Sequence, residues 1–80
     1  MEHVTVRYWA AARAAAGTAQ EVLPGTTVGE VLSAARSRHG DGLARVLERS
    51  SVLVDGVRGG PGTVLTAGAT LEVLPPFAGG

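Results

Sequence analysis

Cysteine and lysine are both missing from this 80-residue sequence. Without cysteine, the chain cannot form disulfides, ligate zinc through thiolates or use a side-chain thiol as a nucleophile. Without lysine, it offers only its N-terminal amine for amide linkage to another chain. A P-loop is also excluded, because that motif needs a lysine beside Ser or Thr. We therefore interpret the glycine-rich stretch from Gly56 to Thr63 as a loop between strands.

An excess of one charge is missing too, since seven basic and seven acidic residues give a formal net charge of zero at pH 7. The arginines are spread from Arg7 to Arg58 without a cluster, which argues against nucleic-acid binding. No apolar run approaches the length of a membrane span, and the first residues lack the pattern of a secretory signal. We expect a cytoplasmic protein with no nucleic-acid or membrane partner.

Residues that commonly carry catalysis or bind metal are scarce. His3 and His39 are the two histidines, and we expect each to be solvated or to cap a helix, because neither has an identifiable catalytic partner. The serines lack the strand-turn-helix setting of a nucleophile elbow, and the carboxylates are scattered. The sequence therefore predicts no metal site and no bound cofactor. By elimination, the distinctive reactive group is a terminal carboxylate.

The hydrophobic pattern of the first third predicts two strands around a short helix. Apolar and polar residues alternate from His3 to Trp9, the pattern of a half-buried strand. The alanine-rich stretch from Ala10 to Ala16 predicts one or two helical turns that end at Gly17. A second strand is predicted from Thr18 to Leu23, stopped by Pro24.

A longer helix is predicted next. Thr27 and Glu30 have capping-box spacing, in which each side chain satisfies a backbone donor of the other residue. Gly40 predicts the end of this main helix. One helical face carries the apolar residues that we expect to pack on the sheet: Val28, Val31, Leu32 and Ala35.

The remaining segments complete a small α+β domain. The predicted elements are a short helix around Leu43 to Leu47, a strand from Ser51 to Val54, a tight turn at Asp55-Gly56, a brief strand at Val64-Leu65 and a last strand from Thr70 to Leu74. We expect one β-grasp domain over residues 1–80, with a mixed sheet of four to five strands and one main helix on one face. Exposed apolar residues on the uncovered face would mark a partner surface.

The sequence ends in a segment suited to entering another protein's active site. Pro75 and Pro76 have a fixed φ and no N–H, so they predict an extended tail that projects from the last strand over residues 75–80. Gly79 and Gly80 have no Cβ and can thread a narrow channel. Because a carboxylate is a poor electrophile at pH 7, another enzyme must activate it, most simply as an acyl-adenylate.

Two segments resemble the small subunit of molybdopterin synthase and related ThiS-like sulfur carriers of the ubiquitin fold. The first is VRYWAAAR, from Val6 to Arg13, and the second is LPPFAGG, from Leu74 to Gly80. The helix start at Thr27 and the turn at Asp55-Gly56 also fit. Family members commonly carry valine where Phe77 stands here.

The resemblance implies a carrier subunit that is not itself a catalyst. A ubiquitin-activating-like enzyme would adenylate Gly80 with ATP, and sulfur from a donor protein would convert it to a thiocarboxylate. The tail would then enter the large subunit of molybdopterin synthase, where sulfur passes to a pterin precursor of the molybdenum cofactor. The residues expected to carry and position this group are Pro75, Pro76, Phe77, Ala78, Gly79 and Gly80.

Two other functions stay open at this point. One is a sulfur carrier for thiamine, cysteine or thiolated-RNA synthesis, and the other is a ubiquitin-like tag or interaction module that Gly80 joins to a target lysine. For any of them, we expect the sheet face around Thr70 to Leu74 to form a rigid platform beside the tail. Phe77 either anchors the tail in the partner or folds onto its own core, two placements that the sequence does not separate.

Overall fold

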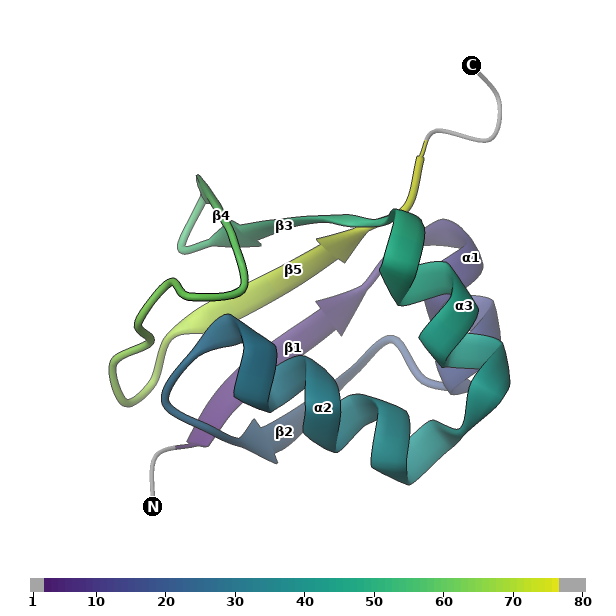
Figure 1. Ribbon diagram of the computed structural model, residues 1–80, viewed down its shortest axis with the longest axis horizontal. Helices are drawn as coiled ribbons and strands as arrows, with labels where there is room; N and C mark the ends of the chain where they lie inside the picture. The colour runs from purple at the N-terminus through teal and green to yellow at the C-terminus, as the bar shows by residue number, and fades with distance from the viewer. Residues whose placement is uncertain (1–2, 77–80) are drawn as a thin grey trace.

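The alternating pattern near the start of the chain forms strand β1 (His3–Tyr8), which stops one residue before the predicted boundary because Trp9 is the N-cap of the next helix. The structure is a computed structural model and describes residues 3–76. β1 pairs antiparallel with β2 (Gln20–Pro24) and parallel with β5 (Thr70–Leu74). Figure 1 shows β1 and β5 running side by side toward the same end of the molecule.

The other edge of β5 pairs antiparallel with β3 (Ser51–Val54), and β3 forms a hairpin with β4 (Val57–Gly59). The predicted turn joins them: Asp55 has φ 47° and Gly56 has φ 85°, the two positive values that a type I′ turn requires. Residues 3–76 thus contain a five-stranded mixed sheet in the order β2-β1-β5-β3-β4.

Two predictions in this half of the chain were wrong. The stretch from Gly56 to Thr63 is not all loop, since β4 occupies three of its residues; a strand this short is too brief to show an alternating pattern. Conversely, Val64 and Leu65 do not form a strand. Val64 makes a single bridge to Thr27 and is 71% exposed, whereas Leu65 is buried as part of the core.

Glycine ends two of the three helices within residues 3–76, as predicted. These helices are α1 (Ala10–Ala16), α2 (Val28–His39) and α3 (Asp41–Arg49). Gly17 ends α1 with φ 75° and Gly40 ends α2 with φ 85°, conformations that a side chain with a Cβ adopts only at a cost. In Figure 1, α2 and α3 lie over one face of the sheet, and α1 lies where β1 ends.

The N-terminus of α2 uses the predicted cap in a modified form. Thr27 Oγ1 accepts a hydrogen bond from the backbone N–H of Glu30 at 3.2 Å, as a capping box requires. The Glu30 carboxylate, however, reaches one residue further back and accepts from the backbone N–H and the hydroxyl of Thr26, at 2.7 and 2.8 Å. The main partner of the Glu30 carboxylate is therefore Thr26 and not the predicted Thr27, because Thr26 offers two donors. The hydrogen bonds from Thr26, with a smaller contribution from the Thr27 N–H, lower the pKa of Glu30.

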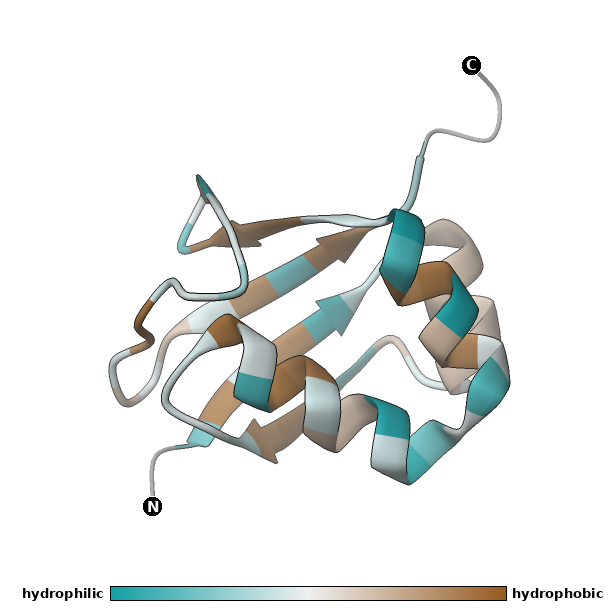
Figure 2. Ribbon diagram, in the orientation of Figure 1, coloured by the Kyte–Doolittle hydropathy of each residue, from teal (hydrophilic) through white to brown (hydrophobic). Residues whose placement is uncertain are grey.

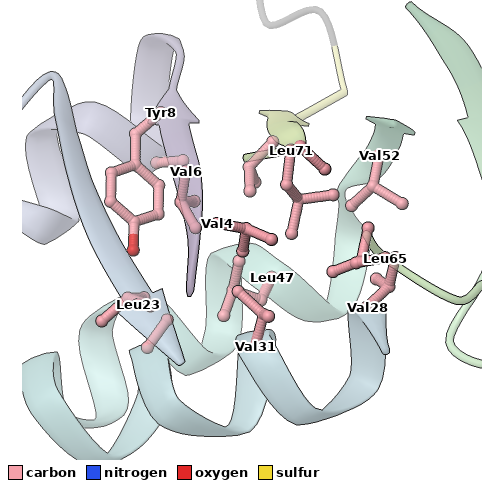
Figure 3. Close-up of a cluster of buried hydrophobic side chains, with 14 of the residues drawn as sticks. Val4, Val6, Tyr8, Leu23, Val28, Val31, Leu47, Val52, Leu65 and Leu71 are labelled. Carbon is pink, nitrogen blue, oxygen red and sulfur yellow. The ribbon is translucent and has the colours of Figure 1, made fainter. Parts of the chain in front are cut away.

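The core lies between the sheet and the helices, and Figure 2 shows hydrophobic and hydrophilic residues alternating along β5. Figure 3 shows side chains from strands and helices meeting in one cluster. Of the predicted α2 face, Leu32 is only half-buried, because it lies at the margin of the contact with the sheet. The buried residues are Val4, Val6, Tyr8, Ala12, Leu23, Val28, Val31, Ala35, Leu43, Leu47, Val52, Leu65, Ala69, Leu71 and Val73.

Candidate functional site

The candidate site begins where β5 ends. Leu74 is the last residue of β5, and Pro75 and Pro76 continue the chain away from the sheet (Figure 1). Proline has no N–H to donate, so neither residue can extend the ladder with a neighbouring strand. The backbone N–H of Trp9 donates to the carbonyl of Val73 at 3.2 Å and closes the contact between β1 and β5 just before this point.

Two of the six predicted tail residues are placed by the structure. Pro75 is half-buried against the body of the protein, and Pro76 is exposed. The other four, Phe77, Ala78, Gly79 and Gly80, lie outside the described residues. The projection of the tail and the role of Phe77 therefore stay predictions.

Trp9 lies beside the end of β5, where Pro75 and Pro76 begin the tail, and it was not among the predicted site residues. Its side chain is 39% exposed, large for an indole. Its Nε1 donates to Glu72 Oε2 at 3.1 Å, and the guanidinium of Arg7 lies 5.0 Å from its ring centroid, within range of a cation–π interaction. Arg7 Nη1 also lies 3.9 Å from Glu72 Oε2. The indole is thus held in one orientation while still exposed.

Register explains why these three side chains meet. Val6 and Tyr8 point into the core, so Arg7 between them points to the opposite face, and Arg7 is the register partner of Glu72 on β5. The signal for Trp9 was present in the sequence: an aromatic residue follows directly after the last inward-facing position, Tyr8.

The sheet face opposite the helices carries further apolar surface. Val22 is 61% exposed on β2, and Leu53 and Leu74 are half-buried on β3 and β5. The strand register aligns Glu72 with Leu53 on this same face. We use the term open face for this surface, which consists of Arg7, Trp9, Val22, Leu53, Glu72 and Leu74. The sheet segment from Thr70 to Leu74, where we expect a platform, contributes Glu72 and Leu74 to the open face.

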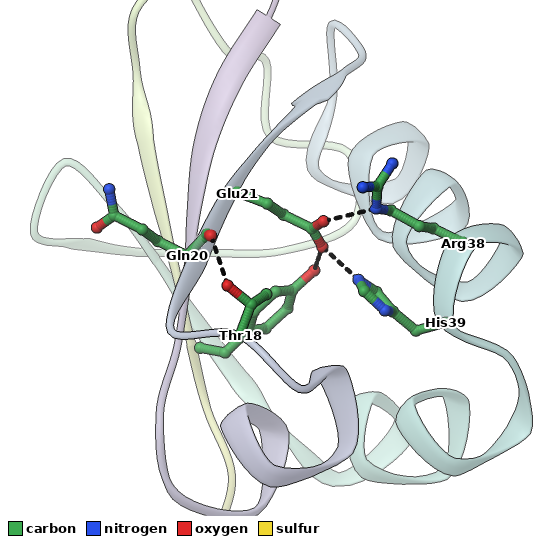
Figure 4. A network of polar contacts seen from close by, with 6 residues as sticks. Thr18, Gln20, Glu21, Arg38 and His39 are labelled. Carbon is green, nitrogen blue, oxygen red and sulfur yellow. Dashed lines mark hydrogen bonds and ion pairs between the residues drawn. The ribbon is translucent and has the colours of Figure 1, made fainter.

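A polar cluster braces the covered side of the same end of the sheet. Glu21 on β2 accepts a hydrogen bond from the Tyr8 hydroxyl at 2.6 Å, and His39 Nε2 lies 2.6 Å from the same carboxylate oxygen, Oε2. Arg38 Nε pairs with the other oxygen at 2.9 Å (Figure 4). We call this cluster of Tyr8, Glu21, Arg38 and His39 the brace. It connects the C-terminal end of α2 to strands β1 and β2.

The prediction for His39 was therefore wrong, because it is half-buried and bonded to Glu21 instead of being solvated or capping a helix. Sequence reasoning could not find this contact, since Glu21 and His39 belong to separate elements. His3 is exposed, as expected.

The brace shifts the ionisation of two of its members. Burial opposes the charge of Glu21, but hydrogen bonds from Tyr8 and His39, with the positive charges of His39 and Arg38, outweigh it and lower the pKa of Glu21. Burial, together with the bond to the Glu21 carboxylate, raises the pKa of the Tyr8 hydroxyl above its usual value. Glu21 is therefore an ion at neutral pH and Tyr8 a neutral donor.

Within residues 3–76, no three side chains of the types His, Cys, Asp and Glu come together as a metal site would need. None of the three helices in this range combines the length and the apolar character needed to cross a membrane.

Comparison with known proteins identifies the family. Residues 6–80 match the ThiS family. The chain belongs to the ThiS family. The predicted resemblance to ubiquitin-fold sulfur carriers and the predicted β-grasp fold are both confirmed. No curated protein matches the chain.

Solved structures resemble this ThiS family member over nearly their whole length. The small archaeal modifier protein 1 of Methanosarcina acetivorans is 26% identical, with a TM-score of 0.88 over 100% of this chain and 98% of that chain. A chain of the BexX/CysO complex of Amycolatopsis orientalis is 30% identical, with a TM-score of 0.81 over 96% of this chain and 99% of that one.

A third structure is a complex of subunits 1 and 2 of the molybdopterin-converting factor of Helicobacter pylori. It matches with 20% identity and a TM-score of 0.70 over 98% of this chain and 99% of that chain, a likeness that shows the fold alone. Two of these three structures thus contain a partner protein.

Proposed function

We propose that this chain is the small, sulfur-carrying subunit of a molybdopterin synthase. A Gly80 carboxylate oxygen attacks the α-phosphorus of ATP on a ubiquitin-activating-like enzyme, and pyrophosphate leaves. Sulfide released by a donor protein then attacks the carbonyl carbon, AMP leaves, and loss of the sulfide proton gives the thiocarboxylate. The large subunit transfers this sulfur to a pterin precursor. Because activation consumes ATP, we place these steps in the cytoplasm.

The observation that supports the sulfur-carrier role in this proposal is the family match, which runs through residue 80 and so includes the Gly-Gly segment. The described residues support it in a second way. β5 delivers the prolines at an end of the sheet where Trp9 is exposed yet held by hydrogen bond and cation–π contact. A fixed aromatic beside a reactive tail lowers the ordering cost of docking, because less freedom is lost on binding.

Trp9 and the open face are the proposed docking surface for the activating enzyme and the large subunit. Aromatic and arginine side chains dominate the energy of many interfaces, and this surface presents both. Phe77 stays a second proposed anchor, further along the tail.

Mass spectrometry of the intact protein tests the chemistry. The chain is produced together with an adenylating enzyme and a sulfur donor, and we expect part of it to gain the mass of one oxygen-to-sulfur exchange at Gly80. A chain lacking Gly79 and Gly80 serves as the control and should show no exchange while unfolding at an unchanged temperature, because termini make few contacts. Consistent absence of the exchanged species in the intact chain would reject the carrier role.

Two relatives favour specific alternatives. The match to the BexX/CysO complex, at 30% identity, supports a sulfur carrier for another acceptor, such as cysteine, thiamine or thiolated RNA. Incubation of the thiocarboxylate form with a molybdopterin synthase large subunit, or with a cysteine-synthase-like enzyme, distinguishes these roles by which enzyme consumes the sulfur.

The match to a small archaeal modifier protein supports a ubiquitin-like tag, in which the activated Gly80 forms an amide with a target lysine. This role predicts covalent conjugates whose digests contain a lysine carrying the chain's C-terminal residues. A carrier predicts the thiocarboxylate instead.

A further inference from the structure

A groove opens on the helix side of the tail root, opposite the open face. Its volume is about 640 Å³, and its apolar lining, which we call the floor, consists of Ala11 on α1, Val46 on α3, and Pro75 and Pro76. Its charged lining, which we call the rim, comes from α3. It forms because α1 packs against α3 with small side chains, which leaves space where the two prolines pass. Pro75 and Pro76 therefore lie between the groove and Trp9.

The rim of the groove carries arginines that lack partners within the described residues. Arg45 and Arg49 are one turn apart on α3, both are exposed, and neither makes an ion pair or a side-chain hydrogen bond with another residue of the range 3–76. Like charges at this spacing repel each other. The dipole of α3 favours Arg49 in the last turn, but its influence fades before Arg45.

We propose that this groove binds an acidic, extended segment of the enzyme that receives the tail, with its carboxylates on Arg45 and Arg49 and an apolar side chain on the floor. The proposal rests on the proposed function, since it assigns the partner's second point of contact. Guanidinium groups bind carboxylates through paired hydrogen bonds, which set direction as well as charge. Glu48, the one acidic residue on the rim, repels a carboxylate and so restricts where the segment sits.

A partner that contacts both Trp9 and the groove would fix the chain on both sides of Pro75 and Pro76. Trp9 contacts the partner from the open face, and the groove contacts it from the helix face, so Pro75 and Pro76 are held between two bound surfaces. The direction of the tail is then set at its root, and fewer conformations are lost when the tail enters the active site.

Charge reversal tests the rim. Affinities for the adenylating enzyme and for the large subunit are measured for Arg45→Glu, Arg49→Glu and the double variant. The matched control is Arg36→Glu, an exposed arginine in the last turn of α2 and outside the groove, with the same change in net charge. For at least one of the two enzymes, we expect about threefold weaker binding for each single variant and about tenfold for the double, with smaller differences at high salt.

A second pair of variants tests the floor without touching the arginines. Ala11→Glu places bulk and negative charge in the groove, whereas Ala14→Glu places the same side chain on an exposed position of α1 outside it. We expect Ala11→Glu to weaken binding several-fold and Ala14→Glu to leave it unchanged, with similar unfolding temperatures for both.

The outcomes separate the two proposals. If the wild-type chain is adenylated and bound but the double variant binds both enzymes as tightly as Arg36→Glu does, the groove proposal is overturned and the proposed function stands. If the wild-type chain is neither bound nor adenylated, both are rejected. Self-association in sedimentation that Ala11→Glu abolishes would assign the groove to a second copy of the chain and also overturn the proposal.

Discussion

Tyr8 and Trp9 are neighbours in the chain, yet they lie on opposite sides of the sheet and have opposite roles. Tyr8 is 2% exposed, packs in the core and donates its hydroxyl to Glu21. Trp9 is 39% exposed and is held from outside by Arg7 and Glu72. At this end of the sheet, the face covered by the helices holds the core and the polar cluster around Glu21, whereas the open face holds Trp9 on the proposed docking surface.

The largest difference between the faces should appear when leucines are truncated. Leu71 is fully buried on β5, and Leu71→Ala should cost about 2 to 5 kcal/mol of unfolding free energy through the cavity it leaves. Leu53 is half-buried on the open face, and Leu53→Ala should cost about 1 kcal/mol. Urea unfolding of both variants measures this. Equal losses would mean that the open face is part of the core.

Truncation of Trp9 should affect binding more than stability. We expect Trp9→Ala to weaken binding to the activating enzyme or the large subunit by about 2 kcal/mol or more, because a central aromatic is lost from the interface. The unfolding free energy should fall by about 1 to 2 kcal/mol, less than for Leu71→Ala, since the indole is only partly buried. Binding is measured by calorimetry and stability by urea unfolding. A loss of stability with unchanged affinity would remove Trp9 from the docking surface.

The brace should make the covered face sensitive to acid. The pKa of Glu21 in the folded protein lies below its ordinary value of 4.5, so its stabilising effect is complete above that pH and is lost as pH falls through the folded pKa. Glu21→Gln should cost about 1 to 2 kcal/mol at neutral pH, because hydrogen bonds to a charged group are replaced by weaker ones.

Unfolding free energy measured from pH 7 to pH 3 checks this prediction. We expect the difference between wild type and Glu21→Gln to shrink below about pH 4.5. A difference that stays constant across this range would show that the ionisation of Glu21 does not contribute.

The smallest loss of stability should follow a change at Glu72, which contacts Arg7 and Trp9 on the open face. Glu72→Gln keeps an acceptor for Trp9 Nε1 but removes the charge beside Arg7, and we expect stability to fall by no more than about 0.5 kcal/mol. Indole fluorescence reports whether Trp9 keeps its surroundings. A clear change in the emission would show that the carboxylate charge, and not only the hydrogen bond, orients the ring.

Local features of the fold were predictable because their causes are local. The glycines at 17 and 40 end helices since each adopts a positive φ, and Asp55-Gly56 turns a hairpin for the same reason. Alternation in β1 predicted its buried side. β4 and the single bridge at Val64 escaped prediction because pairing with distant residues decides them, not their own pattern.

In the candidate site, too, local features could be predicted from the sequence and contacts between distant residues could not. Pro75 and Pro76 break a strand wherever they occur, so the root of the tail could be predicted from the residues themselves. The open face depends on register, since only the pairing of β1 with β5 brings Glu72 to Arg7 and Trp9. The brace depends on where α2 ends, which brings His39 to Glu21 across 18 residues of sequence.

Most of the element types, the break in the last strand at Pro75 and the lack of thiol and lysine chemistry follow from the sequence alone, because dihedral limits and side-chain chemistry belong to each residue. The surfaces beside Pro75 and Pro76, in contrast, depend on the tertiary structure. Trp9 on one side and the groove with Arg45 and Arg49 on the other are assembled from four elements that are separate in the chain. Such neighbours are created by packing of the whole sheet against its helices, which no local pattern encodes.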